Sequence, residues 1–159
     1  MDETTRQAAQ EYLAGKLSEE EQLYEEQQNR ATALARSYEA WKRFRGAVYA
    51  KCREWNEVTN EETLSCKETP LGDLRVWCAA KSKQLTVHYD AKKLLITLKN
   101  TARPENEKDA VLRIEGYRSG AERDDRDVHF VMNQQAVNVD MMLVGELRVL
   151  TGMSRQRQN

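Results

Sequence analysis

The sequence predicts an α+β protein, with an N-terminal helical hairpin that includes one long helix packed on a five-stranded antiparallel meander, plus a C-terminal helix. Three observations support this fold class. Up to about Thr59 the apolar residues recur every three or four positions, which is the period of a helix. From about Leu74 they alternate, which is the period of a strand. No proline occurs between Ser18 and Pro70, so nothing interrupts a long helix there.

The first part of the chain is predicted to form two helices. Residues 4–14 place alanine, tyrosine and leucine side chains on one side, and Gly15 suits the position just after a helix C-terminus. Ser18 followed by Glu21 is a capping box that marks the start of a second helix, which runs to about Val58. We expect the polar first turns of this second helix to project from the body or to pair with the first helix.

The second half of the long helix carries an apolar repeat of seven residues. Such a repeat predicts a seam that covers the sheet, with Arg45 as the misfit and Phe44 beside it as a substitute. One row of the seam contains Leu34, Trp41, Val48 and Trp55, and the other contains Tyr38, Arg45 and Cys52.

The remaining elements follow a hinge at residues 60–73. Strands are predicted at residues 74–79, 84–90, 94–99, 110–117 and 128–132, and their short connections favour antiparallel neighbours. Asn138 or Asp140 caps a final helix, which Gly152 ends. The apolar stripe of this helix is predicted to contain Met141, Val144, Leu147 and Leu150.

The domain organisation follows from these elements. Residues 1–59 form an N-terminal helical region. Residues 60–153 contain the sheet and the C-terminal helix, which we expect to form one globular unit with the second half of the long helix. Residues 154–159 are predicted to be a disordered tail.

Composition narrows the classes of protein. The net charge is −1, no export signal is evident, and no apolar run approaches the roughly 20 residues that span a bilayer. Three cysteines at irregular spacing are typical of free thiols in a reducing compartment. We therefore expect a cytoplasmic protein that has no membrane partner.

No motif for catalysis, cofactor binding or metal binding is present. Cys66, His88 and His129 lack the spacing of metal ligands, and no base accompanies the thiol. We predict no catalytic, metal or cofactor-binding residue and no cofactor, and we expect a non-enzymatic protein. The alternative is a small-molecule-binding protein or small enzyme with a pocket between sheet and helices, to which Tyr89, Tyr117, Cys66 or the two histidines would contribute.

Charge is unevenly distributed along the helical region. Residues 1–28 hold eight acidic and two basic side chains, a net of −6, whereas residues 29–58 hold seven basic and three acidic ones, a net of +4. When two copies of this helical region pair antiparallel, the acidic half of one attracts the basic half of the other. The basic half also interleaves arginine with aromatic residues, as single-stranded nucleic-acid binders do, and its basic face would be Arg36, Lys42 and Arg43. The acidic half disfavours nucleic acid because it repels phosphates.

The sequence does not determine the function. The best hypothesis is a protein–protein interaction or oligomerisation module built on the long amphipathic helix, with another protein or a second copy as partner. A coiled-coil homodimer is one form of it. A regulator linked to nucleic acid through the basic face is the other alternative. The predicted partner-binding residues are Leu23, Tyr24, Gln27, Arg30, Ala31 and Leu34.

Overall fold

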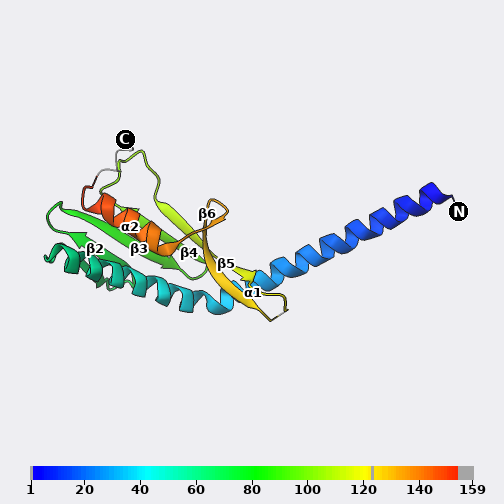
Figure 1. Ribbon diagram of the computed structural model, residues 1–159, viewed down its shortest axis with the longest axis horizontal. Coiled ribbons are helices and arrows are strands. Elements are labelled where there is room, and N and C mark those ends of the chain that lie inside the picture. The colour runs from blue at the N-terminus through cyan, green and yellow to red at the C-terminus, as the bar shows by residue number, and fades with distance from the viewer. Residues whose placement is uncertain (1, 123, 154–159) are drawn as a thin grey trace.

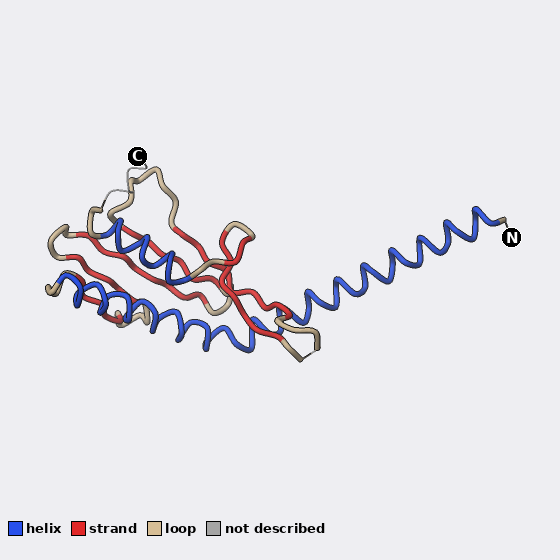
Figure 2. Tube along the Cα trace, in the orientation of Figure 1, coloured by secondary structure: helices blue, strands red, loops and turns tan. Residues whose placement is uncertain are grey.

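The computed structural model describes residues 2–122 and 124–153. The predicted tail at residues 154–159 lies outside this part of the chain. Figures 1 and 2 show one long helix, a sheet and a second helix. The elements are α1 (Glu3–Thr59), β1 (Leu64–Glu68), β2 (Leu74–Cys78), β3 (Lys83–Asp90), β4 (Leu95–Asn100), β5 (Ala110–Arg118), β6 (Arg126–Met132), β7 (Gln135–Ala136) and α2 (Val139–Leu150).

The predicted helical hairpin is wrong, because α1 is a single uninterrupted helix. Its N-cap is Asp2, whose side chain accepts a hydrogen bond from the backbone N–H of Thr4 at 3.2 Å. Gly15 and the Ser18–Glu21 pair therefore lie inside the helix. A glycine in a helix costs only about 1 kcal/mol, which good helix formers on either side offset. The helix ends at Asn60, whose φ of 55° is left-handed.

The sheet is an antiparallel meander, as predicted, but among the residues that the structure describes it has seven strands and not five. Neighbouring strands pair in sequence order from β1 to β7. The five predicted strands correspond to β2 to β6, while β1 falls in the expected hinge and β7 has only two residues. The chain is therefore a mixed helix and sheet protein in which each strand pairs with the next.

Both helices pack on one face of the sheet, which we call the inner face. Their buried side chains join those of the strands in one core. The face of α1 that enters this core contains Ala33, Ser37, Ala40, Trp41, Phe44, Val48 and Cys52. Phe44 thus replaces Arg45 as predicted. Leu34 and Tyr38 were expected on the seam, but they are 52% and 58% exposed, because there the preceding residues Ala33 and Ser37 face the sheet instead.

The C-terminal helix α2 is capped as predicted and buries a slightly different stripe. The side chain of Asn138 accepts a hydrogen bond from the backbone N–H of Met141 at 3.1 Å. Met141 itself is 73% exposed, so its place in the apolar stripe is wrong. The buried residues of α2 are Leu143, Glu146, Leu147 and Leu150.

The first part of α1 projects beyond the sheet (Figure 1), and the helix changes direction near the point where it leaves the body (Figure 2). Residues 3–24 are exposed at every position, and we call this segment the arm. In the described part of the chain, no helix combines the length and the apolar character that crossing a membrane requires.

Candidate functional site

The arm carries several large apolar side chains that are exposed. Its tyrosines and leucines are between 41% and 70% exposed. Scattered exposed apolar residues are ordinary, but a concentration on one projecting element is typical of an interaction site. These side chains belong to Tyr12, Leu13, Leu17, Leu23 and Tyr24.

Several of these residues continue into a stripe along the side of α1 that faces away from the sheet. A helix of 3.6 residues per turn brings the members of this stripe to within roughly 40° of one line. Leu34 lies at its margin. We call this set the outer stripe, and it consists of Leu13, Leu17, Tyr24, Ala31 and Tyr38, all exposed. Of the predicted partner-binding residues, Tyr24 and Ala31 lie on it.

Leu23, Gln27 and Arg30, also predicted to bind a partner, occupy a different surface at the base of the arm. They line an open groove of about 870 Å³ between α1 and the body. The opposite wall includes Lys92, Lys93 and Arg113. The structure therefore divides five of the six predicted residues between the outer stripe and this basic groove, and Leu34 lies at the margin of the stripe.

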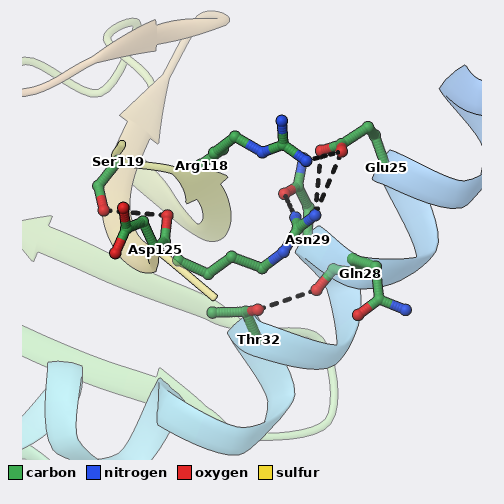
Figure 3. A network of polar contacts seen from close by, with 8 residues as sticks. Glu25, Gln28, Asn29, Thr32, Arg118, Ser119 and Asp125 are labelled. Atoms are coloured by element: carbon green, nitrogen blue, oxygen red, sulfur yellow. Dashed lines mark hydrogen bonds and ion pairs between the residues drawn. The ribbon is translucent and has the colours of Figure 1, made fainter. Parts of the chain in front are cut away.

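A polar cluster fixes the base of the arm (Figure 3). Glu25 accepts a hydrogen bond from Arg118 at 2.8 Å and one from Arg126 at 3.2 Å. Arg126 also donates from Nη1 to Oδ1 of Asn29 at 2.7 Å, and its side chain is only 9% exposed. Because Arg118 and Arg126 are directly opposite on β5 and β6, Glu25 relieves the repulsion between them. This cluster joins the arm to the body.

Gly116 allows the close approach of α1 to β5. A Cβ atom at this position would lie 2.2 Å from the backbone oxygen of Asn29. No side chain fits at that distance, so only glycine permits this packing. Asn29 is thus held both by Arg126 through its side chain and by contact through its backbone.

The predicted basic face of α1 is partly neutralised within the chain. Arg36 forms an ion pair with Asp127 at 3.7 Å. Lys42 pairs with Glu39 at 3.9 Å, and its Nζ lies 5.0 Å from the centre of the Tyr38 ring. Arg43 is exposed. Two of the three predicted cations therefore already have partners on the protein.

The side chains expected to line a pocket contact different partners in different parts of the sheet. His88 Nδ1 is 2.6 Å from Asp73 Oδ1, and His129 stacks on Tyr117 with ring centres 4.5 Å apart. Tyr89 donates from its hydroxyl to Ser37 at 2.9 Å in the core. In the described part of the chain, no three metal-ligating side chains come together. A ligand-binding or enzymatic role stays a prediction.

Cys66 lies beside Cys52, with which it lines a shallow groove at the end of α1. A hydrogen bond between the two side chains raises the pKa of the Cys52 thiol, and burial raises it further. The same hydrogen bond lowers the pKa of Cys66. Cys66 is therefore the more readily ionised thiol of the two.

One buried polar cluster was not predicted. Glu146 is 3% exposed and accepts hydrogen bonds from Asn100 at 3.1 Å and from Arg103. Burial would lower the pKa of Arg103, but the carboxylates of Glu146 and Glu107 outweigh burial and raise it. The cluster borders an open groove of about 1190 Å³ beside α2. The sequence signal that could have found it is the carboxylate of Glu146 directly before the predicted apolar position Leu147.

Comparisons with known proteins assign no family to this chain. No protein-family model matches it, and neither the curated proteins nor the solved structures include a match.

Proposed function

We propose that this protein is a non-enzymatic interaction module in which the arm and the outer stripe of α1 bind a helix of another protein or of a second copy. The observation that supports it is the concentration of exposed apolar side chains on the arm, from Tyr12 to Tyr24. Burying one leucine contributes about 1.5–3 kcal/mol, so burying several of them offsets much of the entropic cost of association. A cytoplasmic location stays a prediction.

The physics of isolated helices supports the same proposal. Most of the stability of a helix in a protein comes from packing of its apolar face and not from helix propensity. Residues 3–24 are exposed at every position, so the body of the protein supplies little of this packing to the arm. A partner helix laid along the outer stripe would supply the missing packing.

Charge restricts the partner. The three consecutive glutamates Glu19, Glu20 and Glu21 lie on the arm, and residues 1–28 carry a net charge of −6. A basic amphipathic helix complements this charge, and complementary charge increases the association rate and selects the partner. The basic half of α1 in a second copy has the required sign, so self-association is one form of the proposal.

Site-specific photo-cross-linking in the full chain tests this proposal. A photoreactive phenylalanine analogue replaces Leu17 on the outer stripe, and in a matched variant it replaces Gln22, which is also exposed but lies roughly 140° away around the helix. We expect cross-linked products from position 17, with the attached peptide identified by mass spectrometry, and far fewer from position 22. Equal yields from both positions, or none from either, would contradict a specific face.

A further inference from the structure

The outer face of the sheet, opposite to α1 and α2, is not covered by either helix. Residues alternate between faces along each strand, so the register shows which side chains share the outer face. Leu74, Val76 and Leu85 point into the core. Their neighbours Arg75 and Trp77 therefore lie on the outer face, and both are exposed.

Three cations form a row across four strands of this face. Lys67 on β1 is directly opposite Arg75 on β2, Arg75 is opposite Thr86 on β3, and Thr86 is opposite Lys99 on β4. With neighbouring strands about 4.8 Å apart, the row extends over roughly 14 Å. Lys67, Arg75 and Lys99 are all exposed.

The chain does not neutralise this row. Like charges directly opposite each other destabilise a sheet. On the inner face, the opposed pair Arg118 and Arg126 is bridged by Glu25. On the outer face, no residue of the described chain forms an ion pair with Lys67, Arg75 or Lys99. These three cations are therefore available to pair with an external anion.

An aromatic ring lies beside the cations. Trp77 follows Arg75 by two residues on the same face and is 38% exposed, although tryptophan is usually well buried. Together with Lys67, Arg75 and Gln84 it lines an open groove of about 500 Å³. A flat ring next to cations, with an amide nearby, matches the base and the phosphate of a nucleotide.

We propose that a single-stranded nucleic acid binds across the outer face of β1 to β4. Its phosphates lie along Lys67, Arg75 and Lys99, and one base stacks on Trp77 with Gln84 at its edge. The acidic arm does not oppose this binding, because it projects from the body on the side opposite to β2 (Figure 1). This site is independent of the arm, and it uses none of the predicted cations of the helix face.

An acidic peptide is the competing ligand class. It would satisfy the three cations equally well, since carboxylates also pair with lysine and arginine. It gains little from a tryptophan ring, whereas every base presents a face that stacks on one. The position of Trp77 beside the row therefore favours nucleic acid.

Fluorescence anisotropy of a labelled oligo(dT) of about 12 nucleotides tests the proposal in the full chain. We expect binding at about 50 mM salt that weakens toward 200 mM. Replacing Trp77 with threonine should weaken binding about tenfold and leave the salt dependence unchanged. The triple variant Lys67→Gln, Arg75→Gln and Lys99→Gln should reduce the slope of log K against log salt by about 2, since each phosphate contact contributes roughly 0.7.

Two matched controls locate the site. Arg113→Gln changes a cation of the outer face away from the row, and Arg36→Gln with Lys42→Gln and Arg43→Gln removes the helix face. Neither should alter the affinity. Absence of binding at low salt, or loss of binding only in the helix variant, would overturn the proposal. Binding of poly-glutamate as tight as that of oligo(dT), with no effect of Trp77→Thr, would instead assign the row to an acidic peptide. Thermal unfolding of each variant confirms that it folds.

Discussion

Residues 3–24 and residues 33–52 belong to the same helix, yet the first segment is exposed throughout and the second carries every buried residue of α1. Backbone hydrogen bonding is the same in both segments. The second is held by Trp41, Phe44 and Val48 against the sheet, whereas the first is exposed at every position. Helical sequence pattern therefore sets the conformation of α1, while packing decides which part of it contributes to global stability.

Removing an aromatic ring from each segment tests this difference most strongly. Phe44 is 1% exposed and contacts Trp41 and Phe130, with ring centres 6.3 and 5.4 Å away. Phe44→Ala should lower the free energy of unfolding by about 3–5 kcal/mol, because it leaves a cavity in the core. Tyr12→Ala, at a position that is 70% exposed, should change it by no more than about 0.5 kcal/mol. Urea unfolding followed by circular dichroism measures both values.

A large effect of Tyr12→Ala in that measurement would contradict the comparison. It would show that the arm is packed in solution, on a second copy or on the body. Repeating the measurement at several protein concentrations separates these two cases, since only association makes unfolding concentration-dependent.

A substitution at Gly116, where α1 approaches β5 between the two segments, should lower the free energy of unfolding by an intermediate amount. In Gly116→Ala the new Cβ would meet the backbone oxygen of Asn29, which must move. We expect a loss of about 1–3 kcal/mol, as for other overpacked sites, together with loosening of the contacts of Glu25 with Arg118 and Arg126. Hydrogen exchange should show faster exchange of α1 amides around Asn29, with little change in β2. Unchanged exchange there would mean that the junction does not hold the arm.

The sequence predicted the class of fold because the helical period and the strand period each persist over many residues. Alternation in β2 to β6 is regular, and the core residues it indicates, such as Leu74, Val76 and Leu85, are buried. β1 was missed because it is an edge strand with a buried Leu64, a half-buried Cys66 and three exposed residues, a pattern close to that of a loop. Without β1, the cation row on the outer face was not visible either, since Lys67 lay in a presumed hinge.

The helical hairpin was predicted from local sequence signals that do not interrupt α1 in the structure. Gly15 and the capping box from Ser18 allow a helix to end and restart, but they do not require it. The seam of α1 was misplaced for a related reason. Periodicity defines a stripe but not which rotation meets the sheet, so Leu34 was assigned to the core and Ala33 was overlooked, although Ala33 is 2% exposed and Leu34 is 52% exposed.

A glycine-to-alanine substitution, made once in each segment, should have the smallest effect on stability. Gly15 and Gly46 are both exposed within α1, and a Cβ atom added to either would meet no atom of the described chain within 4 Å. Alanine is favoured over glycine in a helix by about 1 kcal/mol at each position. Gly46→Ala lies in the packed segment and should raise the melting temperature by about 2–4 °C.

Gly15→Ala should leave the melting temperature unchanged and act only on the arm. The arm opens without the core, so the added helical stability should appear as roughly fivefold slower hydrogen exchange of nearby arm amides. If Gly15→Ala raised the melting temperature as much as Gly46→Ala, the arm would unfold cooperatively with the body, and the outer stripe would have to be covered in the free protein. Equal exchange rates in Gly15→Ala and the parent chain would show instead that arm opening is not limited by helix propensity.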